Sequence, residues 1–218
     1  MEQESESDQR RQTGLSRRLL RAAYTLWAPL YDPLIRPLFR ESRAQSLSAL
    51  GSADGQTILI DGIGTGLDLP LLPRGANYVG IDLTPAMLTR SQTTARRLGR
   101  PIGLITADAM ALPFQDAVFD RVIMHLILAI VPTPTAALAE AARVVKPDGL
   151  ILIFDKFLRP GQRAPLRRWV SPLIGRIATH TDMVFEDVLA ACSMLVVVSD
   201  ESDAAEGWFR RIVLRRKQ

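Results

Sequence analysis

Cysteine is nearly absent from this sequence: its 218 residues include one, Cys192. An internal disulfide is therefore impossible, and a lone cysteine flanked by apolar residues is typical of a small buried side chain. Histidine is almost as scarce, with two residues. No set of Cys and His has the spacing of metal ligands, so we expect no metal site.

Long apolar runs and a secretion signal are also lacking. No run reaches the roughly 18 residues of a membrane-spanning helix, and the acidic first residues lack the apolar core of a signal peptide. The sequence therefore indicates a cytoplasmic protein. Lysine is rare, so that arginine provides most of the net charge of +4. This net positive charge is compatible with a solvated basic surface, or with binding to an anionic membrane or a phosphorylated substrate.

The charge pattern divides the chain into three parts. Residues 1–12 are polar and begin with an acidic run, which is typical of a disordered tail. Residues 13–50 are rich in arginine, and leucines at three- and four-residue steps predict an amphipathic helical cap. Residues 51–218 then predict one α/β domain of ordinary composition. The cap could also lie on the inner face of the membrane, which leaves a peripheral location open.

Three alternating glycines follow the first predicted strand. Residues 58–60 are a short apolar run that fits a strand buried on both faces. Gly62, Gly64 and Gly66 then allow a tight turn and close approach of a ligand to the backbone. Residues 67–72 predict a helix, whose N-terminus would face the ligand. The dinucleotide motif requires a glycine where this chain has Leu67, which disfavours a nicotinamide-dependent oxidoreductase.

Two further positions lie where nucleotide ligands are usually bound. Asp82, with Leu83 beside it, ends the second predicted strand and is placed to accept hydrogen bonds from ribose hydroxyls. His125 follows the fourth predicted strand, at the carboxyl edge of the sheet. Its imidazole could orient a substrate or take up a proton, although a histidine in an apolar run is more often a core residue.

The stretch 57–73, together with the A-D-A sequence at 107–109, resembles the cofactor motifs of class I S-adenosylmethionine-dependent methyltransferases. The resemblance implies a doubly wound, seven-stranded, mostly parallel sheet with an antiparallel last strand and an N-terminal helical cap. It also implies S-adenosylmethionine as the cofactor, Asp108 as the acceptor for the adenine amino group and Ala109 as a backbone donor to the ring. The nucleic-acid methylation motif N-P-P-Y is missing after the fourth strand, so we expect no nucleic-acid substrate.

One residue departs from this family pattern. The motif acid usually stands two residues before the first glycine, where this chain has Ile60, whereas Asp61 directly precedes Gly62. A shift of one residue turns a strand side chain to the opposite face of the sheet. Asp61 could therefore bind the amino group of the cofactor's methionine part or face elsewhere. In the second case the chain could be a binding module that methylates nothing.

The N-terminal sequence Y-T-L-W-A-P-L-Y-D resembles that of bacterial phospholipid N-methyltransferases and related quinone methyltransferases. In those enzymes a helical segment covers the cofactor and places tyrosines near the active site. The resemblance implies catalytic roles for Tyr24 and Tyr31, alongside His125. It favours a phosphatidylethanolamine-type amine as methyl acceptor, with a quinone precursor or another small molecule as the alternative. The oligomeric state is left open.

Overall fold

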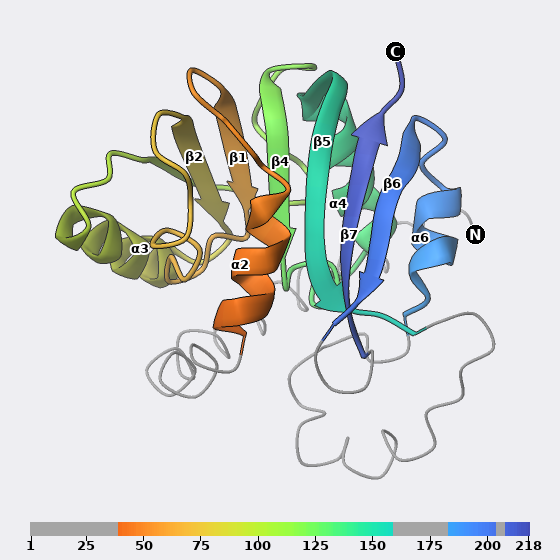
Figure 1. Ribbon diagram of the computed structural model, residues 1–218, viewed down its shortest axis with the longest axis horizontal. Helices are drawn as coiled ribbons and strands as arrows, with labels where there is room; N and C mark the ends of the chain where they lie inside the picture. The colour runs from red at the N-terminus through yellow and green to blue at the C-terminus, as the bar shows by residue number, and fades with distance from the viewer. Residues whose placement is uncertain (1–38, 159–182, 204–207) are drawn as a thin grey trace, which may run out of the picture.

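The computed structural model describes residues 39–158, 183–203 and 208–218, which form one sheet with helices on both faces (Figure 1). The strands are β1 (Thr57–Asp61), β2 (Asn77–Asp82), β3 (Gly103–Thr106), β4 (Phe119–His125), β5 (Val145–Lys156), β6 (Leu195–Ser202) and β7 (Phe209–Arg216). The helices are α2 (Arg40–Ser48), α3 (Pro85–Arg97), α4 (Pro134–Val144) and α6 (Phe185–Ala190).

The sheet has seven strands in the order β3-β2-β1-β4-β5-β7-β6. Neighbouring strands from β3 to β5 are parallel, whereas β7 is antiparallel to both β5 and β6. The predicted fold class, including the antiparallel last strand, is confirmed. The strand order reverses between β1 and β4, and a doubly wound fold binds its ligand at such a reversal, beyond the carboxyl ends of the strands.

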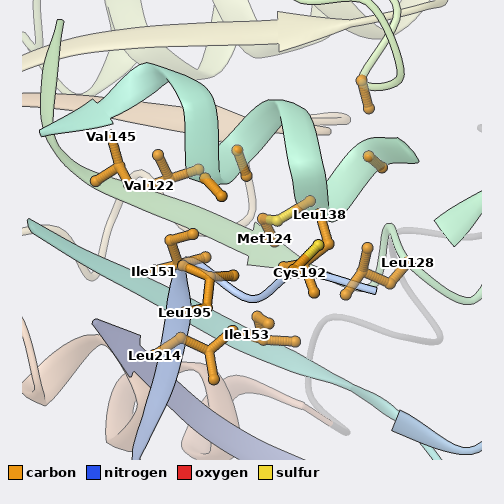
Figure 2. Packing of buried hydrophobic residues seen from close by; sticks show 14 of the residues in the cluster. Val122, Met124, Leu128, Leu138, Val145, Ile151, Ile153, Cys192, Leu195 and Leu214 are labelled. Carbon is orange, nitrogen blue, oxygen red and sulfur yellow. The ribbon is translucent and has the colours of Figure 1, made fainter. Parts of the chain in front are cut away.

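Two hydrophobic cores cover the two faces of the sheet. Because side chains alternate along a strand, Ile58 and Ile60 of β1 join the core shared with α2 and α3, whereas Leu59 joins the core shared with α4 and α6. Figure 2 shows the second core, where Leu138 of α4 packs over Met124 and Cys192 lies among the apolar side chains. The free cysteine is buried, as predicted, and burial raises the pKa of its thiol.

The prediction of a helix at residues 67–72 is wrong. The structure has a series of turns there, closed by hydrogen bonds from Leu69 N to Gly66 O and from Leu71 N to Asp68 O. Pro70 and Pro73 have no N–H and their rings obstruct the preceding turn, so an α-helix cannot continue through this segment. The glycine turn is therefore followed by an irregular loop, and no helix N-terminus faces the ligand at this point.

Strand β5 has an irregularity near its start. Residues 146–149 lie within the strand, and the register with β4 shifts there between Phe119 and Arg121. Asp148 has φ of 61°, which lets the chain bend tightly at this point. Strand β7 runs antiparallel to β6, as the family resemblance implied for the last strand.

The N-terminal cap is described only in part. Helix α2 lies in front of the sheet at the carboxyl ends of β1 and β4 (Figure 1), and it packs against β5 and β7. The predicted tail of residues 1–12, the rest of the cap before Phe39, and Tyr24 and Tyr31 lie outside the described residues. The arginine-rich segment after β5 (159–182) does so as well.

Candidate cofactor and active site

A cleft opens at the carboxyl ends of β1, β2 and β4, where the segments singled out in the sequence meet. Its lining includes nearly all the predicted cofactor residues: Asp61, Gly62, Gly64, Asp82, Leu83, Asp108, Ala109 and His125. Gly66 shapes the loop without lining the cleft. The sheet therefore brings together positions that are up to 64 residues apart in the sequence, from Asp61 to His125.

The glycine turn depends on backbone conformations that other residues rarely adopt. Gly62, Gly64 and Gly66 have φ of 73°, 56° and 83°. A Cβ at Gly62 would lie 2.8 Å from Ile127 Cδ1, and one at Gly66 would lie 2.7 Å from Leu69 Cδ1. The turn therefore needs both the left-handed backbone and the missing side chains. It leaves main-chain atoms exposed to a ligand on its cleft side.

Asp82 fastens the glycine turn to the next loop. Its Oδ2 accepts a hydrogen bond from Gly64 N at 3.0 Å, and its Oδ1 accepts one from Thr84 N at 2.8 Å. Burial raises the pKa of Asp82, and these two hydrogen bonds oppose the shift. Each carboxylate oxygen still has a second lone pair, so the side chain can also accept from ligand hydroxyls.

The loop after β3 forms the opposite side of the cleft. Asp108 Oδ1 accepts from Met110 N at 2.9 Å, which holds the loop in a tight turn and orients the carboxylate. Ala109 and Met110 line the cleft beside it. A carboxylate acceptor next to a main-chain N–H has the hydrogen-bonding pattern that the edge of an adenine ring requires.

Asp61 is a buried carboxyl group that has no partner among the described residues. The side chain is fully buried, and among the residues that the structure describes neither of its oxygens finds a hydrogen-bond donor. Burial, with Asp82 and Asp108 as neighbouring carboxylates, raises the pKa of Asp61 to about 8. Native proteins rarely leave a buried polar group unpaired, so this one fits a site completed by a ligand's donor.

His125 is the centre of a buried polar network on the α2 side of the cleft. Its Nδ1 lies 3.0 Å from Asp68 Oδ1, and its Nε2 lies 3.0 Å from Ser46 Oγ. Arg43 Nη1 donates to the same Asp68 oxygen at 2.9 Å. Burial opposes the ionisation of Asp68, but Arg43 and then His125 hold the pKa of this carboxyl group well below its usual range. The ionised carboxylate therefore keeps a proton on Nδ1, which leaves Nε2 as the basic nitrogen.

Sequence reasoning missed three members of this network: Arg43, Ser46 and Asp68. Arg43 and Ser46 are three residues apart and therefore share one face of α2, a signal that the sequence does contain. Asp68 is an acidic residue in an otherwise apolar loop. Neither signal identifies the partner, because Asp68 and Ser46 lie 57 and 79 positions away from His125 in the sequence.

The buried carboxyl group of Asp155 supports the loop after β4. Asp155 in β5 accepts from Ala129 N through Oδ2 at 3.0 Å and from Lys156 N through Oδ1 at 2.8 Å. Burial raises the pKa of Asp155 to about 6, against the effect of these hydrogen bonds. The loop begins with Leu126 at φ of 58°, and it provides much of the apolar wall of the cleft.

The described residues contain neither a cluster of metal ligands nor a membrane-spanning helix. Within 39–158, 183–203 and 208–218, no three His, Cys, Asp or Glu side chains are grouped so that they could hold a metal ion. The helices in these same ranges are all too short or too polar to cross a bilayer.

Residues 60–153 match the sequence model of a family described as "Methyltransferase domain". A phosphatidylethanolamine N-methyltransferase of Cereibacter sphaeroides is 29% identical over 178 residues, which cover 80% of this chain and 87% of that protein. A demethylmenaquinone methyltransferase of Tropheryma whipplei is 30% identical over 150 residues, or 66% of this chain and 62% of that protein. The chain thus spans most of the first relative and under two thirds of the second.

Solved structures share the fold at low sequence identity. A geranyl diphosphate C-methyltransferase from Streptomyces coelicolor, in complex with S-adenosyl-L-homocysteine, has a TM-score of 0.67 at 18% identity, covering 81% of this chain and 76% of that one. The [4+2]-cyclase SpnF has a TM-score of 0.69 at 16% identity, covering 82% and 80%. One fold therefore supports methyl transfer in one neighbour and cyclisation in another.

Proposed function

This chain belongs to the class I S-adenosylmethionine-dependent methyltransferases, and from that premise we propose that its acceptor is the amine of a phosphatidylethanolamine-type lipid. The observation that supports this acceptor most directly is the extent of the first relative's match. The similarity to the phosphatidylethanolamine N-methyltransferase covers 87% of that protein, whereas the match to the demethylmenaquinone enzyme covers 62%. The match therefore includes sequence outside the shared cofactor domain, where acceptor contacts are usually made.

Different residues of the cleft hold different parts of the cofactor. We propose that the turn at Gly62 and Gly64 receives the amino-acid part, that Asp82 accepts from the ribose hydroxyls, and that Asp108 and Ala109 recognise the adenine edge. Bound S-adenosylmethionine supplies a methyl group already activated by its positive sulfur. The chain's own task is to hold the acceptor in line and to exclude water, because positioning alone can lower the barrier by about 7–11 kcal/mol.

His125 is the proposed proton acceptor. An amine attacks only in its neutral form, and each methylation of an N–H amine leaves a proton to be removed. Asp68 fixes the ring so that Nε2 is basic, and Ser46 Oγ is hydrogen-bonded to this nitrogen. A proton released in the cleft is therefore taken up at Nε2, next to the Ser46 hydroxyl. General-base help of this kind contributes about 10²–10⁴ in rate.

A quinone precursor is the second candidate acceptor. The observation in its favour is the series of quinone methyltransferase relatives, such as the Paracoccus denitrificans enzyme, which is 33% identical over 144 residues. The apolar wall formed by Ile127, Ile130 and Val131 would suit a ring with a lipophilic tail as well as an acyl chain. The same His125 would take the phenolic proton.

The deciding experiment is tritiated methyl transfer by the full chain. The cofactor would be offered with vesicles of phosphatidylethanolamine, with phosphatidylcholine vesicles as a fully methylated control, and with a demethylated quinol. We expect label in the ethanolamine lipid, and little with the variant Asp82→Asn. Label in the quinol alone would favour the second candidate. Binding of S-adenosylhomocysteine without transfer to either acceptor would indicate a non-catalytic module.

A further inference from the structure

Helix α2 carries a buried cationic side chain into the cleft. Arg43 is 7% exposed, lines the cleft and donates from Nη1 to Asp68 Oδ1 at 2.9 Å. Its Nε is also buried, yet it has no acceptor in the part of the chain that the structure describes. An N–H group of a guanidinium that is buried and unpaired is costly, and it is uncommon in a native protein unless a ligand completes the site.

The charges around the cleft indicate what that ligand group is. Among the described residues lining the cleft, Arg43 is the only arginine or lysine, whereas Asp61, Asp82 and Asp108 are all acidic. The Asp68 carboxylate, which pairs with Arg43, also bonds His125 through the same oxygen. An anionic group on a ligand is therefore repelled by the carboxylates of Asp82 and Asp108 and attracted to Arg43.

We propose that Arg43 is the oxyanion-binding residue of this cleft and takes the carboxylate or phosphate group of a bound ligand. The planar guanidinium matches both groups through paired N–H donors, which a lysine cannot do. Nη1 is already bonded to Asp68, so the donors that remain are held in place before the ligand arrives. Such preorganisation lowers the entropy lost on binding.

Two side-chain hydrogen bonds join helix α2 to the cleft. Arg43 bonds the loop after β1 through Asp68, and Ser46, on the same helix face, bonds His125 at the end of β4. Figure 1 shows α2 across the carboxyl ends of these strands. The network that positions the proposed base therefore also positions the oxyanion site. It keeps His125 and Arg43 in a fixed position relative to each other.

This inference rests on the proposed function, which provides two sources of the anion. One is the carboxylate of the cofactor's amino-acid part, and the other is the phosphate of the lipid head group. Both chemistries suit Arg43, and they are separable because S-adenosylhomocysteine can be tested without any lipid.

The first arm of the experiment measures cofactor binding by calorimetry. S-adenosylhomocysteine and its decarboxylated analogue are titrated into the wild-type chain, Arg43→Met, Arg43→Lys and the control Arg40→Met, which changes an exposed arginine of the same helix. If the cofactor carboxylate is bound, the wild type should lose about 10- to 100-fold in affinity for the analogue. Arg43→Met should bind the two ligands equally, and Arg40→Met should behave like the wild type.

The second arm uses a short-chain phosphatidylethanolamine below its micelle concentration as the acceptor. If Arg43 binds the head-group phosphate, Arg43→Met should raise KM for this lipid about tenfold or more and leave the affinity for S-adenosylhomocysteine unchanged. Arg43→Lys keeps a positive charge beside the buried Asp68 carboxylate but lacks the paired N–H donors of a guanidinium. It therefore tests those donors without leaving Asp68 uncompensated. The analogue comparison in the wild type requires no substitution at all.

The inference is overturned if the wild type binds S-adenosylhomocysteine and its analogue equally and Arg43→Met changes neither affinity nor KM. That result would leave the proposed function intact. A wild-type chain that binds no S-adenosylhomocysteine would overturn the proposed function, and this inference with it.

Discussion

Replacing Asp61 by asparagine should stabilise the ligand-free protein, and the gain should grow as the pH rises. The carboxyl group is fully buried without a hydrogen-bond donor among the described residues, and its pKa is about 8 because of burial and then of Asp82 and Asp108. Asparagine has almost the same shape and carries no charge. The substitution therefore removes the ionisation and leaves the packing nearly unchanged.

The magnitude follows from the difference between the folded and unfolded pKa values. The folded value is about 8 and the unfolded value is 3.8, so between them the native state binds one proton more than the unfolded state. The free energy of unfolding then falls as pH rises, by about 1.36 kcal/mol per unit. From about pH 5 to about pH 8 the wild type should lose about 4 kcal/mol that Asp61→Asn retains.

Thermal unfolding followed by circular dichroism measures this difference. For a chain of this size 1 kcal/mol shifts the Tm by about 2–4 °C, so the advantage of Asp61→Asn should widen by roughly 8–16 °C between about pH 5 and about pH 8. Asp187→Asn is the matched control, because it changes an exposed carboxyl group in α6. It should follow the wild type at every pH.

Parallel curves for the wild type and Asp61→Asn would refute the reasoning. They would mean that the carboxyl group of Asp61 ionises in the folded protein as readily as in the unfolded chain. A donor would then have to reach it, in contrast to the environment described above.

Three further perturbations test other parts of the site. Gly66→Ala should lower the free energy of unfolding by about 1–3 kcal/mol in a denaturant titration, because its φ is 83° and its Cβ would lie 2.7 Å from Leu69 Cδ1. His125→Gln should reduce kcat about 10²-fold or more in the methyl-transfer assay, with the affinity for S-adenosylhomocysteine nearly unchanged; an unaltered kcat would remove His125 as the base. Deletion of residues 1–28 should weaken sedimentation with anionic vesicles, and unchanged sedimentation would contradict membrane binding by the cap.

Much of the fold follows from local sequence signals. The apolar residues 58–60 are buried in β1 as predicted, and the alternating glycines adopt the left-handed conformations that they alone adopt easily. The prediction of a helix at 67–72 failed, because it gave more weight to the apolar spacing than to Pro70 and Pro73. Proline acts on its neighbours' backbone through sterics, so this error was avoidable from the sequence.

The sequence by itself determined the strands and the glycine turn, because both depend on conformational preferences within a few residues. Only the tertiary structure decided the state of Asp61 and the network around His125. Burial and hydrogen bonding depend on which distant segments meet: Ser46, Asp68 and His125 come from a helix, a loop and a strand. A sequence pattern records which groups exist, whereas their charge, partners and access to a ligand are set by the packing that surrounds them.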